Sequence, residues 1–204
     1  PDERKEAAFR KHFKLAENQK VVICVGLFFE RKGILDFVEV AKKMPEYTFI
    51  WFGDVPLVSV PLNIRRVVKK DHPENVIFPG YINGDLIEGA YSGADLFFFP
   101  SYEETEGIVV LEALASQQQV LLRDIPVYEG WLRDCENCYM GKNNQEFELL
   151  IQQLVNRRLP NLALAGFKTA QEKSINQIGE ELKTVYQAVL DQPYDHQIYK
   201  KVTQ

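Results

Sequence analysis

Three glutamates stand just before a glycine in the segment 100–113, which reads Pro-Ser-Tyr-Glu-Glu-Thr-Glu-Gly-Ile-Val-Val-Leu-Glu-Ala. The apolar run after Gly107 predicts a helix that begins at or near this glycine. The amino end of a helix offers unpaired N–H groups and the positive end of the helix dipole, and therefore favours an anion. Because Gly107 has no side chain, a ligand could approach this backbone closely.

Glu112 is a carboxylate within the apolar stretch 108–115, where we expect it to be buried. A buried carboxylate needs partners, and a sugar diol could donate two hydroxyl hydrogen bonds to it. A second interpretation needs no ligand: the acids before Gly107 stabilise a helix start, and Glu112 points to solvent. The segment alone leaves both interpretations open.

Arg31 and Lys32 follow the continuously apolar run 21–26 and precede a stretch with helical spacing. At the carboxyl end of a buried strand, two such cations could neutralise a diphosphate without a metal. The alternative is an exposed pair on a loop. Basic groups and a glycine-marked helix start at one sheet edge together favour a site for an anionic ligand that also carries hydroxyl groups.

Short apolar runs alternate with amphipathic stretches along the chain. The strands expected from this pattern are 21–26, 47–53, 75–78, 95–99, 120–122 and a short one near 138–140. The helices expected are 34–44, 86–94, 108–116 and, with a break at 158–160, the remainder from 145 to 190. Parallel strands need crossover connections, so the alternation predicts an α/β fold with a parallel sheet of about six strands and helices on both faces. Ligands of such sheets bind at the carboxyl ends of the strands.

We expect one domain, residues 1–204, with its core at about 20–190. The charged helix 2–16 and the tail 192–204, which carries Tyr194 and Tyr199, look like appendages. Because the chain begins at Pro1 without a methionine, we expect it to be part of a longer protein.

The composition excludes several classes of protein. Lysine plus arginine number 24 against 29 aspartate plus glutamate, a formal net charge of −5, which disfavours a nucleic-acid binder. Three cysteines are typical of a reducing compartment rather than of a disulfide-built fold. The longest apolar run, 21–29, is far shorter than the roughly 18 residues that span a bilayer. We therefore expect a cytoplasmic protein.

Motifs for cofactors and metals are missing from the sequence. No G-x-G-x-x-G follows an expected strand, and no P-loop or paired-aspartate metal clamp occurs. Cys135 and Cys138 lack a second pair to complete a zinc site, so we regard their spacing as incidental. A basic cluster, Arg65, Arg66, Lys69 and Lys70, is typical of a solvated helix face, with a membrane-surface role as the alternative.

Several motifs together resemble the retaining family 4 glycosyltransferases. Glu104 and Glu112 lie eight residues apart, as do the paired glutamates of that family. Val25-Gly26 followed by Arg31-Lys32-Gly33 is similar to its phosphate loop, Phe78-Pro79-Gly80-Tyr81 to its base-binding segment, and 94–100 to the strand before the paired glutamates. The resemblance implies a Rossmann-like domain, the C-terminal nucleotide-sugar-binding half of a GT-B fold. The string from Glu103 to Ala115, with Leu122-Arg123-Asp124-Ile125-Pro126, most resembles diacylglycerol glucosyltransferases of Gram-positive bacteria.

The resemblance also implies roles for single residues. Lys32, with Arg31 beside it, would hold the diphosphate of a UDP-sugar, and Glu104 would meet hydroxyls of the transferred sugar; these three are the expected catalytic residues. The residues expected to bind the donor are Gly26, Gly53, Tyr81, Ile82, Gly107, Ile108, Val109 and Glu112. Glu112 would bind the ribose, Tyr81 and Ile82 would border the uracil, and the backbone at 107–109 would cradle phosphate and sugar. Family members often carry an arginine where Leu27 stands, so either Arg31 supplies that charge or the diphosphate is held more weakly.

The implied activity is transfer of a hexose, glucose in the first place, from a UDP-sugar to a lipid such as diacylglycerol, with retention of configuration. No cofactor and no metal are expected, and the partners are the UDP-sugar, the lipid acceptor and the inner face of the cell membrane. The acceptor-binding half would lie in a missing N-terminal domain, so the chain alone would bind donor without turnover. The tail 192–204 would pack on that domain or fray. Alternatives are a saccharide acceptor, a nucleotide-sugar epimerase, and a noncatalytic nucleotide-binding or interaction module.

Overall fold

The computed structural model describes residues 2–191 and divides the chain into two compact units, Pro1–Ala170 and Gln171–Gln204. The first unit contains one sheet with strands β1 (Val21–Val25), β2 (Thr48–Phe52), β3 (Val76–Gly80), β4 (Leu96–Phe99), β5 (Val120–Arg123) and β6 (Tyr139–Gly141). Its helices are α1 (Glu3–His12), α2 (Ile34–Lys42), α3 (Leu62–Lys69), α4 (Asp85–Gly93), α5 (Ile108–Ala115), α6 (Asn144–Val155) and most of α7 (Ala163–Glu172). Short 3₁₀ turns, which the sequence did not predict, lie at η1 (Glu30–Lys32), η2 (Leu57–Ser59) and η3 (Pro126–Tyr128).

The strands are parallel in the order β3-β2-β1-β4-β5-β6, which confirms the predicted six-stranded parallel sheet. All residues of β4 and β5 are buried, as expected for apolar runs covered on both faces. From β1 the chain builds outward to β3 and then returns to β4 on the other side of β1. The strand order therefore reverses between β1 and β4, and a crevice forms at the carboxyl ends of strands at such a point.

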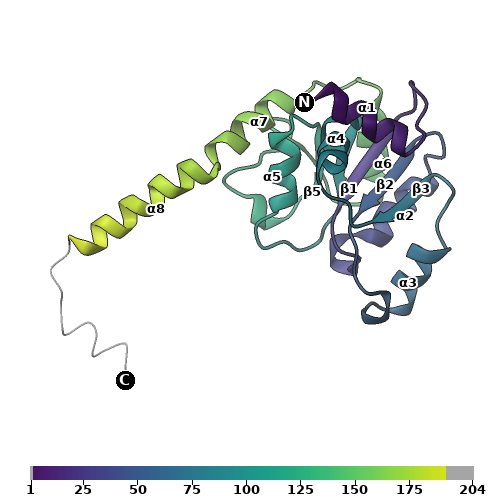
Figure 1. The fold of residues 1–204 in the computed structure, drawn as a ribbon, viewed down its shortest axis with the longest axis horizontal. Coiled ribbons are helices and arrows are strands. Elements are labelled where there is room, and N and C mark those ends of the chain that lie inside the picture. The colour runs from purple at the N-terminus through teal and green to yellow at the C-terminus, as the bar shows by residue number, and fades with distance from the viewer. Residues whose placement is uncertain (1, 192–204) are drawn as a thin grey trace. The chain divides into compact units, whose positions relative to one another are not determined.

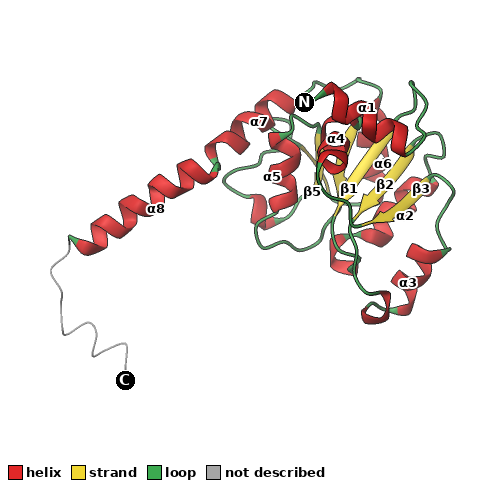
Figure 2. Ribbon diagram, in the orientation of Figure 1, coloured by secondary structure: helices red, strands yellow, loops and turns green. Residues whose placement is uncertain are grey.

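Helices cover both faces of the sheet, as predicted (Figures 1 and 2). On one face α1 packs against α4, and on the other α2 packs against α6. Helix α5 buries Val110, Ala113 and Leu114, whose spacing forms one apolar stripe. Phe37 of α2 contacts Trp51 of β2 with their rings 5.1 Å apart and nearly perpendicular, so aromatic edges lock this helix onto the sheet.

Helix α1 is part of the core, and the expectation that residues 2–16 form an appendage is wrong. Phe9 is fully buried, and its ring lies 6.4 Å from that of Phe52. A Cβ atom placed on Gly89 would lie 2.1 Å from the carbonyl oxygen of Lys5, so only glycine allows α1 to lie this close to α4. Phe9 and Phe13 are four residues apart, a helical spacing, but the many charged residues around them hid this packing.

The C-terminal helices confirm the predicted helical end. The chain is non-helical between α6 and α7, where Pro160 stands, as expected. A second break, unpredicted, precedes α8 (Ile175–Leu190), whose start is capped by the Ser174 hydroxyl accepting from the Gln177 N–H. Tyr194 and Tyr199, expected to pack on a missing domain, lie outside the described residues.

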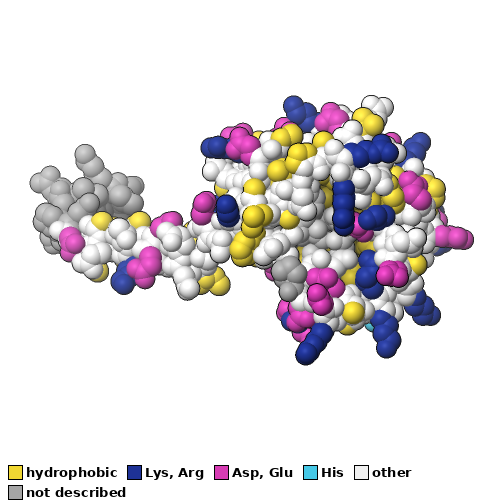
Figure 3. All heavy atoms as spheres, turned by 90° about the horizontal axis from the view of Figure 1, so that it is seen from above, with side chains coloured by type: hydrophobic (Ala, Val, Ile, Leu, Met, Phe, Trp, Pro, Cys, Tyr) yellow, Lys and Arg dark blue, Asp and Glu magenta, His cyan; other side chains and the backbone are white. Residues whose placement is uncertain are grey.

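Lysine and arginine side chains are interspersed with aspartate and glutamate on the face drawn in Figure 3. Nothing on that face resembles the continuous basic surface of a nucleic-acid binder. None of the described helices is long and apolar enough to cross a membrane.

Candidate functional site

Two loops meet at the point where the strand order reverses. The loop 26–33 follows β1 and the loop 100–107 follows β4, and these strands are neighbours in the sheet. The Tyr102 N–H donates to the Arg31 carbonyl oxygen (2.8 Å), which joins the loops through their backbones. The fold thus brings the basic pair Arg31–Lys32 and the acidic segment 103–106 to one edge of the sheet. They lie 70 or more residues apart in the sequence.

Lys32 and Glu104 form an ion pair at this edge. The Lys32 Nζ lies 2.5 Å from the Glu104 Oε1, and the two side chains are 14% and 6% exposed. The Ser101 hydroxyl lies 2.6 Å from the same carboxylate oxygen and donates to it. Each charge therefore compensates the other, and the shortage of water around them keeps their interaction strong.

Arg31 is exposed and differently engaged. Its guanidinium Nη1 donates to the Glu103 carbonyl oxygen (3.1 Å) and lies over the Phe29 ring. Leu27, which stands where relatives of the predicted family often have arginine, is 45% exposed. The guanidinium of Arg31 thus lies beside the loop that carries Glu104.

Helix α5 begins directly after Gly107, whose left-handed backbone (φ 79°) favours glycine. No side chain caps this helix start, and Ile108 is 60% exposed. The first N–H groups of a helix have no partner within it, so this end is open to an anionic group. The Tyr128 ring closes the inner side, because a Cβ atom on Gly107 would lie only 3.1 Å from its Cε1.

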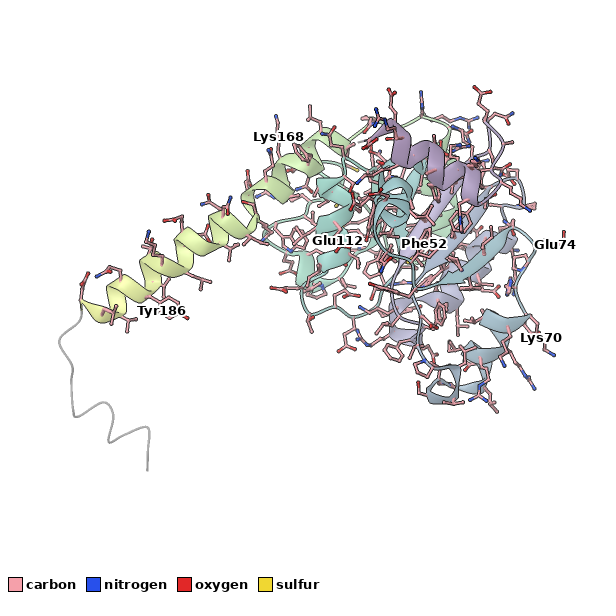
Figure 4. All side chains as sticks on the ribbon, viewed as in Figure 1. Phe52, Lys70, Glu74, Glu112, Lys168 and Tyr186 are labelled. Atoms are coloured by element: carbon pink, nitrogen blue, oxygen red, sulfur yellow. The ribbon has the colours of Figure 1, made fainter. Side chains whose placement is uncertain are left out.

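Glu112 is exposed, and the expectation of a buried carboxylate is wrong. Residues 110, 113 and 114 of α5 face the core, which turns position 112 toward α4, as Figure 4 shows. The Tyr91 hydroxyl donates to the Glu112 Oε2 (2.7 Å). Burial, and then the Glu112 carboxylate, raise the pKa of Tyr91, so this hydroxyl stays protonated and donates.

A cavity of about 550 Å³ brings three of the predicted donor-binding residues together: Tyr81, Ile82 and Glu112 all line it. Val25, Tyr91 and Ser116 complete its wall, with Asn83, Gly84, Ile87, Glu88 and Ala115. Tyr81 is 74% exposed, so its ring is available to a ligand. A second cavity of about 520 Å³, lined by residues such as Asp95, Gln118 and Asn161, contains none of the predicted site residues.

Gly26 and Gly53 lie at the carboxyl ends of β1 and β2, next to each other. A Cβ atom on Gly53 (φ 139°) would lie 2.0 Å from the Gly26 carbonyl oxygen. That oxygen also accepts a hydrogen bond from the Trp51 Nε1 (2.8 Å). The glycine at position 53 is therefore required by the packing of the strand ends, whatever its relation to a ligand.

Arg123, which sequence reasoning missed, holds the loop that carries Glu104. This side chain is 6% exposed, and its Nε donates to the Pro100 carbonyl oxygen (2.9 Å). Its Cζ lies 3.8 Å from the centre of the Tyr102 ring, and its Nη2 pairs with Asp36 Oδ1 at 3.5 Å. An arginine directly after the predicted strand 120–122 was the available signal, but its partners come from the loop 100–107 and from α2.

Tyr91, Ser101 and Tyr128 were also missed. The Tyr128 hydroxyl is buried without a hydrogen-bond partner, and burial followed by the Glu104 charge raises its pKa. Cys24, buried beneath the site, has its pKa raised well above the usual value by burial. In each case the sequence shows an ordinary core residue, because the contact depends on how helices pack.

Among residues 2–191 the structure assembles no group of three His, Cys, Asp or Glu side chains that could hold a metal ion. Cys135 is exposed and Cys138 is buried, and burial raises the pKa of Cys138 to about 12. A group this reluctant to ionise is a poor thiolate ligand.

A sequence profile of the family described as Glycosyl transferases group 1 matches residues 5–173. The chain belongs to this family. As a group 1 glycosyltransferase it is 55% identical, over 90% of its length, to the processive diacylglycerol alpha-glucosyltransferase of Acholeplasma laidlawii. It is 31% identical, over 71% of its length, to the alpha-galactosylglucosyldiacylglycerol synthase of Streptococcus pneumoniae.

Solved glycosyltransferases share the fold. HepE of Anabaena, in complex with UDP and glucose, matches 90% of this chain with a TM-score of 0.75 and 18% identity, over 53% of its own length. Sucrose-phosphate synthase of Thermosynechococcus elongatus matches 89% of the chain with a TM-score of 0.74 and 23% identity, over 49% of its own length. The glycosyltransferase chain likewise spans 55% and 39% of the two curated relatives.

Proposed function

We propose that this chain is the donor-binding part of a glycosyltransferase that moves a hexose, glucose in the first place, from a UDP-sugar to a lipid such as diacylglycerol. The observation that carries the proposal is the arrangement at the strand reversal. There, α5 begins four residues after Glu104 of the Lys32–Glu104 pair and carries Glu112 to the 550 Å³ cavity. The names of the two curated relatives support the lipid acceptor.

In this proposal the diphosphate lies between Lys32 and the start of α5. The Lys32 ammonium has three N–H donors and uses one on Glu104, which leaves two for phosphate oxygens. The open amino end of α5 adds N–H groups and a dipole that stabilise the negative charge on departing UDP. Glu104 accepts hydrogen bonds from sugar hydroxyls, Glu112 from the ribose, and Tyr81 and Ile82 border the uracil.

Retention of configuration is part of the proposal. UDP-glucose is α-linked and the relative from Acholeplasma laidlawii is named an alpha-glucosyltransferase, so an α-product would keep the donor's configuration. We infer attack from the front face through an oxocarbenium-like species. The chain's contribution is then positioning and charge stabilisation rather than a protein nucleophile, and no metal is required.

The acceptor site, in this proposal, lies in that part of the longer relatives that the chain does not match, so residues 1–204 bind donor without turnover. Steady glucosyl transfer to diacylglycerol by the chain alone would contradict this.

The intact protein would work at the cytoplasmic face of the membrane, and helix α3 offers a surface for contact. Residues 55–70 contain four basic and no acidic residues, in a chain of net charge −5. Ile64 faces the core, while Leu62 and Val58 are 67% and 84% exposed. Leu62, Arg66 and Lys69 recur at helical spacing and form one outer stripe, which we call the α3 stripe. Exposed apolar groups beside cations suit an anionic lipid surface.

Calorimetric titration of the chain with UDP, UDP-glucose and UDP-galactose, with and without magnesium, tests the proposal. We expect metal-independent binding at about 0.1–1 mM, equal to roughly 4–5.5 kcal/mol. Lys32→Ala and Glu112→Ala should weaken UDP and UDP-glucose alike, whereas Glu104→Gln should weaken UDP-glucose but not UDP. Absence of binding at millimolar nucleotide would contradict donor binding and favour a noncatalytic module.

A further inference from the structure

Tyr91 joins α4 to the carboxylate that faces the cavity. Its hydroxyl donates to the Glu112 Oε2 at 2.7 Å, across 21 residues of sequence. The Tyr91 side chain is held on all sides, since the residue is 5% exposed and its ring centre lies 5.8 Å from that of Phe97 in β4. Gly89 and Ala90 before it are buried as well, which fixes this part of α4 in the core.

Glu112, by contrast, is exposed and has a flexible side chain. A free glutamate side chain loses on the order of 1–2 kcal/mol of conformational freedom when it is held in place. The bond from Tyr91 restrains the carboxylate before any ligand arrives. It occupies one acceptor position of Oε2 and leaves Oε1 and the second position of Oε2 for other donors.

The direction of this hydrogen bond is fixed by chemistry. Burial raises the pKa of Tyr91 above its usual value of 10.0, so the phenol remains a donor at neutral pH. An ionised carboxylate only accepts. Both residues line the same cavity, so the restrained carboxylate is presented to whatever occupies it. A pair of adjacent hydroxyl groups can donate one hydrogen bond to each of the two oxygens, at the acceptor positions that remain free.

We propose that Tyr91 is a positioning residue that orients the Glu112 carboxylate toward the two hydroxyl groups of a ribose, and so makes the cavity selective for ribonucleotides over 2′-deoxyribonucleotides. This inference rests on the proposed donor binding, because it requires a nucleotide in the cavity. Tyr91 touches Glu112 and acts through it.

The experiment is an NMR titration of the whole chain with UDP and with 2′-deoxy-UDP, which reaches millimolar affinities. The chain without substitutions should bind UDP about ten-fold more tightly than 2′-deoxy-UDP. This is the effect expected when one hydrogen bond to a charged group is lost. Tyr91→Phe should weaken UDP about five-fold and 2′-deoxy-UDP less than two-fold. Glu112→Ala should abolish the preference for UDP over 2′-deoxy-UDP. In a chain that already carries Glu112→Ala, Tyr91→Phe should change the affinity for neither nucleotide.

Tyr139→Phe is the matched control. Tyr139 is also buried, at 2% exposure, and its hydroxyl donates to the Pro160 carbonyl oxygen at 3.0 Å, but it does not line the cavity. Removal of the Tyr139 hydroxyl should leave the ratio of the affinities for UDP and 2′-deoxy-UDP unchanged. The positioning role would be overturned if Tyr91→Phe left the ratio of the UDP and 2′-deoxy-UDP affinities unchanged, whether it weakened both nucleotides equally or neither. A ribose preference that needs Glu112 but not Tyr91 would overturn this inference alone, whereas failure of the unchanged chain to bind UDP would overturn donor binding with it.

Discussion

The Lys32 ammonium and the Glu104 carboxylate, 72 residues apart in the sequence, lie 2.5 Å apart where the strand order reverses. They are the best shielded pair of opposite charges at the proposed donor site, with exposures of 14% and 6%. A nucleoside diphosphate sugar would bring phosphate charge to the Lys32 ammonium and hydroxyl groups to the Glu104 carboxylate. The ion pair therefore holds both side chains in place until a donor shares them.

Removal of one partner of this pair should destabilise the fold. Lys32→Met leaves the Glu104 carboxylate uncompensated, and we expect the free energy of unfolding to fall by about 3 kcal/mol. The double variant Lys32→Met, Glu104→Gln should recover most of the loss, as measured by urea denaturation. Lys42→Met is the control, because its pair with Glu39 is about half exposed and should contribute less than about 1 kcal/mol. Equal losses at positions 32 and 42 would show that shielding has no effect here.

Tyr128→Phe should leave the fold as stable or more stable. The Tyr128 hydroxyl is buried without a hydrogen-bond partner, so its removal relieves the cost of an unsatisfied polar group, about 1 kcal/mol. Tyr139→Phe, which removes a bonded hydroxyl, should instead lose about 1 kcal/mol. Urea denaturation compares the two. A loss at position 128 as large as that at 139 would mean that the Tyr128 hydroxyl has a partner.

Stability should fall in alkali. Burial raises the pKa values of Tyr91 and Tyr128 above the usual 10.0, so the unfolded chain loses these protons first. Each tyrosine's stabilisation is thus complete below pH 10 and declines above it, by up to about 1.4 kcal/mol per pH unit. Tyr128→Phe should make the decline between pH 10 and 11 shallower when denaturation is repeated across this range. An unchanged slope would mean that Tyr128 ionises as readily folded as unfolded.

The α3 stripe should bind anionic vesicles. Arg66→Glu with Lys69→Glu should reduce sedimentation of the chain with phosphatidylglycerol vesicles by about ten-fold or more, since each cation near such a surface contributes about 1 kcal/mol. Lys42→Glu with Lys43→Glu makes the same change of charge at the C-terminal end of α2 and should have little effect. Neutral phosphatidylcholine vesicles should bind neither the chain nor the two double variants. Equal loss in both double variants would assign any binding to net charge rather than to this stripe.

The sequence predicts the sheet well because each strand is a short apolar run between helical patterns. The predicted strand 21–26 and the observed β1, Val21–Val25, differ by one residue, and the other strands lie close to their predicted ranges. The carboxyl-end rule then places the loops after β1 and β4 at one edge. Strand order decides that these loops touch, and the strand order came only from the structure.

Side-chain environment was harder to predict than position. Glu112 stands in an apolar stretch but is exposed, because α5 turns residues 110, 113 and 114 to the core and leaves 112 facing the cavity. The Tyr91–Glu112 bond and the Arg123–Tyr102 contact depend on how α4, α5 and β5 pack. Spacing along one element carries no information on such pairs.

Chemical-shift mapping of the chain with UDP-glucose is the sharpest test of a donor site at the strand reversal. We expect the largest chemical-shift changes on the amides of Gly107, Ile108 and Val109 and on residues of the 550 Å³ cavity, such as Ile82. Residues of the second cavity, such as Gln118 and Asn161, should remain unchanged. Chemical-shift changes confined to the second cavity would contradict a donor site at the strand reversal. So would the absence of any changes at millimolar UDP-glucose.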